Sequence, residues 1–461
     1  MEKKPSAIAA ISTAQAPGGI GVIRISGPDA RQIADRVFVS AKQKKLTETP
    51  GYTALYGWVY RFESDPAEKL DEAVATVFTA PHSYTGEDVV EFSCHGGLYV
   101  LRRVLDSVLA AGAVAAEAGE FTRRAFLNGK MDLTQAESVM QLIGAQGQQA
   151  LRAALAGREG ALFQRIQKSR EQLLSTAAHL SAWADYPEED IPELDSSSLG
   201  ESLRIVRRDL TRLLDQFDAG RVLREGVNTV IVGRPNVGKS TLMNLLAGCE
   251  RSIVTQFEGT TRDIVEETVL LGGVPLRLAD TAGLRQTEDP VESIGVTRAK
   301  DRLKTAQLIL AVFDSSSPLT QEDKELIQEI RDVPALAVVN KNDLKREIDL
   351  KYIYDNFKHW VYISAQSGQG VKDLEQAVEE LLHTADLNPS EGILFTERQR
   401  DTARRAKEYV EEAIDALESG ITLDAVTVSV EGAVSALLEL TGERASTAIV
   451  DTVFSQFCVG K

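Results

Sequence analysis

Short apolar runs separated by glycines characterise the first quarter of the chain. Runs at 21–25, 73–78 and 89–92 predict β-strands, and an amphipathic stretch over 98–111 predicts a helix. Because strands and a helix share this region, we expect an α+β domain over residues 1–122.

Apolar residues three and four positions apart take over from about residue 134, which predicts long helices. The sequence Thr134-Gln135-Ala136-Glu137 predicts a capping box at the start of the first helix. After a break near 185–192, helical periodicity resumes over 199–223. These segments predict the first part of a helical domain, over residues 123–222.

Helical periodicity returns near the C-terminus, over 396–417, 423–440 and 445–457. Residues 384–461 therefore predict the second part of the helical domain, with an α/β domain inserted at 223–383. Short helices bury little surface alone, so the two parts of the helical domain are expected to pack together.

Composition narrows the class of protein. The chain has 461 residues, of which 43% are hydrophobic, enough for several domains with real cores. It has no apolar run of about 18 residues, and its N-terminus lacks the apolar core of a signal peptide. Three scattered cysteines, Cys94, Cys249 and Cys458, form neither a disulfide framework nor a zinc site. We expect a cytoplasmic protein that does not enter a membrane.

A formal net charge of −17 argues against a broadly basic nucleic-acid-binding surface. Contact with RNA would need local patches of cations. Two candidate patches are Arg123, Arg124 and Lys130, and Arg204, Arg207, Arg208 and Arg212. The second set recurs at helical spacing, which favours a solvated helix face instead.

Residues 233–240 read GRPNVGKS and match the phosphate-binding loop pattern G-x-x-x-x-G-K-[ST]. The apolar run 229–232 predicts a buried strand before the loop, and residues 241–246 predict the start of a helix after it. Glycines let backbone N–H groups surround a phosphate, and the helix N-terminus adds positive potential. We expect Lys239 to reach the β- and γ-phosphates and Ser240 to place its hydroxyl on Mg²⁺.

Four further elements follow in the order that Ras-like GTPases use. They are residues 259–263 with a switch threonine, 280–283 (DTAG), 340–343 (NKND) and 364–365 (SA). The Asp343 carboxylate can accept from both the ring N–H and the exocyclic amine of guanine, a pair that adenine lacks. The inserted domain is therefore predicted to be a Ras-like α/β P-loop GTPase domain.

Leu284 stands where Ras-like enzymes carry the glutamine that orients the attacking water, and its side chain cannot hydrogen-bond. Glu288, Asp289 and Glu292 are candidates for holding the water, although each also fits a solvated loop charge. No arginine finger is evident. Asn236 is compatible with holding a monovalent cation against the phosphates and equally with capping its own loop.

The GTPase elements inside a helical domain, followed by the ending FCVGK at 457–461, resemble the MnmE family of tRNA-modification GTPases, also called TrmE. The segments that carry the resemblance are 20–27 (IGVIRISG), 83–89 (SYTGEDV), 120–133 (EFTRRAFLNGKMDL), 233–241, 259–263 and the C-terminus. Val459 departs from the family, which usually has isoleucine there, and the change is conservative.

The resemblance implies a homodimer that hydrolyses GTP to GDP and phosphate with stimulation by K⁺. With an FAD-dependent partner, MnmG (GidA), in a heterotetramer, the family adds an aminomethyl-type (carboxymethylaminomethyl) group at C5 of the wobble uridine of certain tRNAs. The implied cofactors are GTP, Mg²⁺, K⁺ and 5-formyltetrahydrofolate or another tetrahydrofolate derivative that supplies the one-carbon unit.

The resemblance also implies site residues. The folate-binding residues would be Arg24, Glu87, Lys130 and Lys461. The GTP-binding residues would be Asn236, Val237, Gly238, Lys239, Ser240, Thr241, Thr255, Gln256, Phe257, Glu258, Gly259, Thr260, Thr261, Asp280, Thr281, Ala282, Gly283, Asn340, Lys341, Asp343, Ser364, Ala365 and Gln366. The K⁺ ligands would be Asn236 and the backbone carbonyls of Thr255, Phe257 and Thr260, and the Mg²⁺ ligands Ser240 and Thr261.

Two residues are implied to be catalytic. Glu292 would position the attacking water, and Cys458 would act in the modification chemistry as nucleophile or proton donor. A cysteine fourth from the end also resembles a prenylation box, but Gly460 and Lys461 fit that pattern poorly. Cys94 is expected to be structural, because it and its neighbour His95 point to opposite faces of a strand.

Two other functions remain open from the sequence. One is a regulatory GTPase switch in ribosome assembly without modification chemistry, although such proteins usually carry an RNA-binding module that is not evident here. The other is a folate-binding scaffold whose GTPase only controls assembly, and a scaffold should tolerate serine at Cys458.

Overall fold

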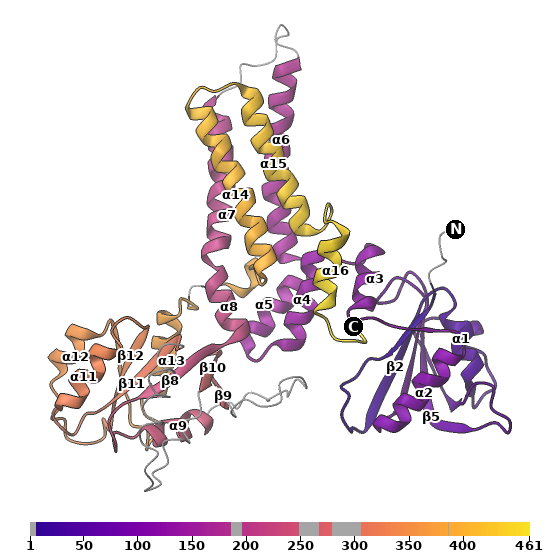
Figure 1. The fold of residues 1–461 in the computed structure, drawn as a ribbon, viewed down its shortest axis with the longest axis horizontal. Helices are drawn as coiled ribbons and strands as arrows, with labels where there is room; N and C mark the ends of the chain where they lie inside the picture. The colour runs from indigo at the N-terminus through magenta and orange to yellow at the C-terminus, as the bar shows by residue number, and fades with distance from the viewer. Residues whose placement is uncertain (1–5, 186–195, 249–266, 279–305, 386) are drawn as a thin grey trace. The chain divides into compact units, whose positions relative to one another are not determined.

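The computed structural model describes residues 6–185, 196–248, 267–278, 306–385 and 387–461 (Figure 1). The chain divides into two compact units, one of residues 1–140 with 435–461 and one of residues 141–434. None of the helices in the described part is both long and apolar enough to cross a membrane.

The first unit is built on a mostly antiparallel sheet. Its strands, among the described residues, are β1 (Ile8–Ile11), β2 (Ile20–Ser26), β3 (Phe38–Ser40), β4 (Thr53–Tyr60), β5 (Lys69–Phe78), β6 (Val89–His95) and β7 (Val114–Ala115), in the order β3-β4-β5-β6-β2-β1-β7. Helices α1 (Ala30–Val37) and α2 (Leu98–Ala110) cover one face, where Val104 and Phe92 are fully buried. The strands and the helix predicted in this region are confirmed.

A second cluster in this unit joins segments far apart in the sequence. Helices α3 (Glu120–Leu127), the start of α4 (Leu133–Gly144) and α16 (Thr447–Ser455) bury Ala125, Leu133 and Phe454 together. The last residues then reach the sheet domain, where Val459 pairs with Ala118. The C-terminus is therefore part of the same unit as the first strands.

The predicted capping box at Thr134 is wrong, because the cap lies two residues earlier. Asp132 accepts hydrogen bonds at one carboxylate oxygen from the backbone N–H of Thr134 (2.8 Å) and of Gln135 (3.1 Å). In return, Oε1 of Gln135 accepts from the N–H of Asp132 at 3.0 Å. A carboxylate reaches the free amides of the first turn better than a hydroxyl already inside the helix.

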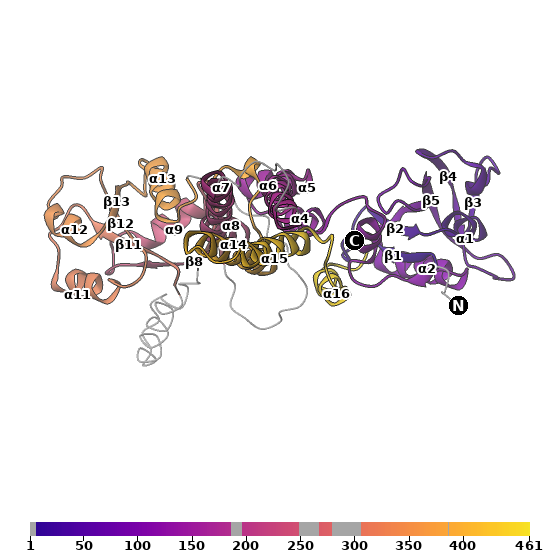
Figure 2. The same ribbon diagram turned by 90° about the horizontal axis from the view of Figure 1, so that it is seen from above.

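The second unit contains a bundle of long helices (Figures 1 and 2). Its helices are α5 (Gln148–Arg158), α6 (Ala161–Asp185), α7 (Ser196–Asp215), α8 (Phe217–Glu225), α14 (Glu397–Glu418) and the first part of α15 (Leu423–Thr441), with a short 3₁₀ turn at Pro389–Glu391. The predicted helix over 199–223 is two helices, broken at Gln216. α7 packs along α14, so the expected packing of the two parts of the helical domain is confirmed.

The inserted domain is a mostly parallel sheet with helices on both faces. Its described strands, β8 (Val227–Val232), β9 (Glu267–Leu271), β10 (Val274–Leu278), β11 (Leu308–Asp314), β12 (Ala335–Asn340) and β13 (His359–Tyr362), lie in the order β13-β12-β11-β8-β10-β9. Its described helices are α9 (Lys239–Gly248), α11 (Gln321–Glu329), α12 (Leu350–Asn356) and α13 (Val371–Leu381).

Alternate residues of the central strand face opposite sides of this sheet. Leu310 lies in the cluster formed with α9 and α13, whereas Ala311 lies in the cluster formed with α11 and α12. A strand buried on both faces is typical of a parallel α/β sheet. The predicted combination of an α+β domain, a helical domain and an inserted P-loop GTPase domain is confirmed.

Candidate functional site

The loop between β8 and α9 has the shape that phosphate binding requires. Gly233 and Gly238 have φ of 148° and 99°, which residues with a side chain rarely adopt. A Cβ at Gly238 would also collide with Nδ2 of Asn340. Lys239 opens α9, and its Nζ donates to the carbonyl oxygens of Gly233 (2.6 Å) and Arg234 (2.8 Å).

The charge at this loop suits an anion. Burial lowers the pKa of Lys239, because desolvation penalises its ammonium group. A phosphate beside the ammonium would supply the missing negative charge. The N–H groups at the N-terminus of α9 would donate hydrogen bonds to the same phosphate. Ser240 and Thr241 are exposed on the first turn of α9, whereas Val237 is buried beneath the loop.

Asn340 joins the phosphate-binding loop to the loop after β13. Its side chain is 2% exposed, its Nδ2 donates to the carbonyl of Val237 at 2.8 Å, and its Oδ1 accepts from the N–H of Ala365 at 2.9 Å. Both loops follow the carboxyl ends of parallel strands, where open α/β sheets bind their ligands. One buried amide therefore links the two loops.

The rest of the predicted guanine-binding element surrounds Asn340. Lys341 has φ of 61°, and its Nζ lies 2.6 Å from Oδ2 of Asp314. Burial tends to raise the pKa of Asp314, but hydrogen bonds from Lys341 and Ser316 outweigh it and hold that pKa below its ordinary value. Asp343 is exposed at the rim, as the recognition of a guanine edge requires. In the loop after β13, Ser364 is buried and Gln366 is exposed.

Several predicted nucleotide- and metal-binding residues lie outside the described residues. They are Thr255, Gln256, Phe257, Glu258, Gly259, Thr260, Thr261, Asp280, Thr281, Ala282, Gly283 and the candidate catalytic Glu292. Leu284, Glu288 and Asp289 also lie outside them.

Asn236 is exposed in the phosphate-binding loop with φ of 65°. Asparagine tolerates this left-handed conformation better than most residues, which is one reason for its presence. Among the described residues its side chain makes no hydrogen bond to its own loop, so the capping role left open by the sequence is not seen. The side chain is accessible to a ligand.

A second candidate site lies in the first unit, around Arg24 on β2. The Arg24 side chain is 15% exposed, and its Nε lies 2.7 Å from Oε1 of Glu91. Its guanidinium carbon lies 5.6 Å from the ring centre of Tyr84 and 5.5 Å from that of Phe121. Lys461 is close enough to matter electrostatically, because burial and then the charge of Arg24 lower the pKa of Lys461 while Glu91 opposes the shift.

Glu87 lies on the same side of β2. Its Oε2 accepts from the hydroxyl of Ser26 at 2.7 Å, and Ser26 shares a strand face with Arg24, two positions away. Nη1 of Arg124 lies 3.2 Å from Oε1 of Glu87. The exposed Lys130 passes beside Gly86 and donates from Nζ to the carbonyl of Pro81 at 3.0 Å.

The two described cysteines differ in exposure. Cys94 is 3% exposed, and burial raises its pKa to about 12, while His95 is exposed and lies 2.7 Å from Asp71. This confirms that Cys94 and His95 point to opposite faces of the strand. Cys458 is exposed, while its backbone carbonyl accepts from the N–H of Gly119 at 3.4 Å.

Two family models and several relatives together match nearly the whole chain. The family model described as "GTP-binding protein TrmE N-terminus" matches residues 7–130, and the one described as "MnmE helical domain" matches residues 133–458. The tRNA modification GTPase MnmE of Symbiobacterium thermophilum is 44% identical over 457 residues, which cover 98% of this chain and 99% of that protein. The chain belongs to the MnmE family.

Other relatives have the same name. The tRNA modification GTPase MnmE of Heliobacterium modesticaldum is 42% identical over 463 residues, covering 98% of this chain and 99% of that protein. Among solved structures, the G domain of the FeoB iron transporter of T. maritima is 25% identical, covering 34% of this chain and 98% of that chain with a TM-score of 0.26. The predicted membership of the MnmE family is confirmed.

Some residues of this MnmE-family chain were not singled out by sequence reasoning. Arg124 was considered only as part of an RNA-binding patch, but it lies 3.2 Å from Glu87 and 2.9 Å from Glu120. Arg123 of the same patch lies 2.8 Å from Asp451. Glu91, which pairs with Arg24, could not be predicted as a site residue, because the sequence shows only a single charge in an apolar strand.

We predict that Asn340→Asp weakens the binding of GTP at least about fivefold, because the buried carbonyl of Val237 loses its donor. Titration with a fluorescent guanine nucleotide measures the effect. The matched control is Asn342→Asp on the same loop, whose Oδ1 accepts from Arg346 and can still do so as a carboxylate. Equal affinities for Asn340→Asp and the unaltered chain would contradict the role of Asn340.

Proposed function

We propose that this chain hydrolyses GTP to GDP and phosphate and takes part in the modification of tRNA. The observation that carries the proposal is the preformed phosphate-binding loop, joined by Asn340 to the guanine-binding loop. Relatives that align with 98% of the chain are named tRNA modification GTPases. The substrates are therefore GTP and tRNA.

The metals of this site are part of the proposal. Mg²⁺ would be held by Ser240 and Thr261, and K⁺ by Asn236 with the backbone carbonyls of Thr255, Phe257 and Thr260. The exposed side chains of Asn236 and Ser240, both in or next to the phosphate-binding loop, support it. A monovalent cation there would supply the positive charge that an arginine finger supplies elsewhere. Glu292 would orient the attacking water.

The site around Arg24 fits a tetrahydrofolate derivative. Arg24 and Lys461 are cations able to pair with the glutamate carboxylates of folate, and Glu87 can accept from the amine and ring N–H of a pterin. Tyr84 and Phe121 present ring faces beside Arg24. Lys130, next to the Glu87 loop, would complete the site.

The modification itself is proposed at C5 of the wobble uridine, where a carboxymethylaminomethyl-type group is added in a heterotetramer with an FAD-dependent MnmG-type partner. The exposure of Cys458, between the anchored residues Phe457 and Gly460, supports a chemical role for its thiol. A homodimer in the cytoplasm completes this proposal. A GTPase switch or a folate-binding scaffold without modification chemistry would leave this thiol without a function.

Hydrolysis of GTP should be faster in KCl than in NaCl at equal ionic strength, since K⁺ fits a site formed by an amide and several carbonyl oxygens. Phosphate release measures the rate. Asn236→Ala should remove most of the difference between the two salts while the binding of GTP persists. Identical rates of the unaltered chain in KCl and NaCl would exclude Asn236 from this role.

Glu87→Gln should weaken the binding of 5-formyltetrahydrofolate about tenfold, because the charged acceptor for the pterin is lost. Isothermal titration calorimetry measures the affinity. The control is Glu117→Gln, an exposed glutamate in the loop before α3. The proposal for this site fails if Glu87→Gln binds folate as tightly as Glu117→Gln does.

Cells that lack this protein should lose C5-modified wobble uridine, and the unaltered chain should restore it while Cys458→Ser does not. Mass spectrometry of nucleosides from total tRNA gives the answer. Restoration by Cys458→Ser would favour the folate-binding scaffold. Unchanged nucleosides in the deleted strain would remove the modification role and direct attention to ribosome assembly.

A further inference from the structure

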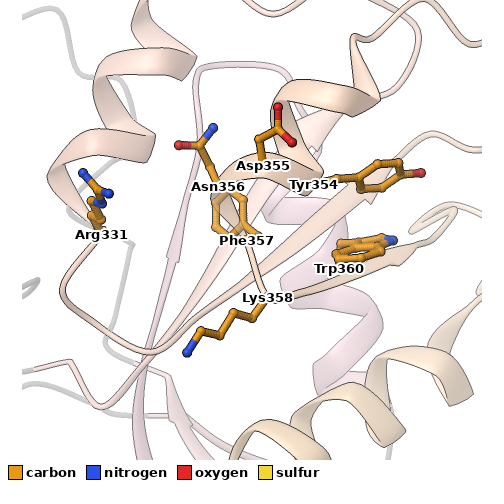
Figure 3. A pocket seen from close by; sticks show the side chains of 7 residues that line it. All are labelled: Arg331, Tyr354, Asp355, Asn356, Phe357, Lys358 and Trp360. Atoms are coloured by element: carbon orange, nitrogen blue, oxygen red, sulfur yellow. The ribbon is translucent and has the colours of Figure 1, made fainter.

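A hollow of about 470 Å³ lies on the inserted domain, away from the nucleotide site (Figure 3). It is lined by Arg331, Tyr354, Asp355, Asn356, Phe357, Lys358 and Trp360. These residues come from the end of α12, the start of the edge strand β13 and the segment before β12. The nucleotide loops follow the carboxyl ends of the same parallel strands, whereas the hollow lies at the amino ends of β12 and β13.

Exposed aromatic rings form one side of the hollow. Trp360 and Tyr354 are 39% and 41% exposed, with ring centres 4.6 Å apart. The Tyr354 hydroxyl contacts that of Tyr362, which lies two positions beyond Trp360 on the same face of β13. We refer to Trp360, Tyr354 and Tyr362 as the aromatic row. Large exposed rings in such a group usually mark a binding surface.

The aromatic row carries no charge and lies beside buried rings. Phe357 is buried below it and packs edge-on against Phe313, with ring centres 5.8 Å apart. Burial and the contact with Tyr354 raise the pKa of Tyr362 to about 12, so its hydroxyl stays neutral at physiological pH. The guanidinium of Arg346 covers the Tyr362 ring at 4.6 Å. Trp360 and Tyr354 are therefore the exposed rings of the row, and the hydroxyl of Tyr362 adds no negative charge.

Cations flank the aromatic row. In Figure 3, Arg331 lies across the hollow from Trp360, and Lys358 lies along its lower side. Both are exposed, and neither forms an ion pair with a carboxylate in the part of the chain that the structure describes. Two arginines on the helical bundle differ, since Arg204 pairs with Glu418 and Arg212 with Glu391. Asp355 is the carboxylate that lines the hollow.

We propose that this hollow binds unpaired nucleotides of the tRNA substrate, with a base stacked on Trp360 and phosphates held by Arg331 and Lys358. The inference rests on the proposed action on tRNA. Proteins bind unpaired RNA through aromatic faces for the bases and cations for the backbone, and the hollow offers both within one surface. Charge complementarity favours RNA as the occupant, because unpaired cations attract a polyanion.

The first test measures the affinity of the full chain for a fluorescently labelled tRNA transcript by anisotropy. Trp360→Ala should weaken binding about fivefold or more, and Trp360→Phe, which keeps a ring, should stay within about twofold of the unaltered chain. GTP hydrolysis without tRNA should be unchanged in both variants, which shows that the domain is folded.

The second test uses the salt dependence of the same affinity. The double variant Arg331→Gln, Lys358→Gln should lower the slope of log affinity against log salt by about 1.5, because two phosphate contacts are lost. The matched control is the double variant Arg204→Gln, Arg212→Gln, which removes two cations that already pair with Glu418 and Glu391, and it should leave the slope nearly unchanged.

Three outcomes would overturn the proposal. If Trp360→Ala binds tRNA as tightly as the unaltered chain, the hollow is not an RNA site, and the proposed function stands without it. If the variant keeps tRNA but loses the FAD-dependent partner in pull-down, the hollow is a protein-docking surface. If the unaltered chain binds no tRNA at any salt concentration, the proposed substrate fails together with this site.

Discussion

The packing of α7 against α14 is the constraint on which the second unit depends. The inserted domain separates these helices in the sequence, so they can meet only if the chain leaves and re-enters the helical bundle at neighbouring points. Arg224 near the exit donates to the carbonyl of Phe395 near the re-entry, and Leu223 and Phe395 share a cluster with the GTPase sheet. The inserted domain is thus attached to the helical bundle at both of its ends.

Charge neutralisation is the corresponding constraint in the first unit. Arg24 and Arg124 are each 15% exposed, and a guanidinium so far from water needs a carboxylate. Glu91 supplies it for Arg24 and Glu87 for Arg124. Lys461 lies near the same cluster, and burial, followed by the charge of Arg24, lowers its pKa while Glu91 opposes the shift. Glu120 also lies 2.9 Å from Arg124, so the three cations of this cluster are matched by three carboxylates.

Local sequence patterns predicted most of the fold, because strands and helices follow hydrophobic periods that can be read along the chain. The phosphate-binding loop was predictable because its two glycines and Lys239 form one continuous motif within residues 233–240. The cap of α4 was assigned to Thr134 because Asp132 and Thr134 both suit that position, and only the path of the backbone decides between them. The pairing of Arg124 with Glu87 spans 37 residues, and no local period encodes it.

The acidic net charge of the chain is compatible with a tRNA substrate, because charges far from the contact surface are screened by salt. At physiological ionic strength, charges more than about 8 Å apart are largely screened, so a net charge of −17 does not by itself repel a tRNA from a particular patch. The outcome depends on which cations lack a carboxylate nearby. On the helical bundle, ion pairs such as Arg204–Glu418 cancel much of the attraction for phosphate. Beside the aromatic row, Arg331 and Lys358 have no such partner among the described residues, so no ion pair cancels their attraction for a phosphate.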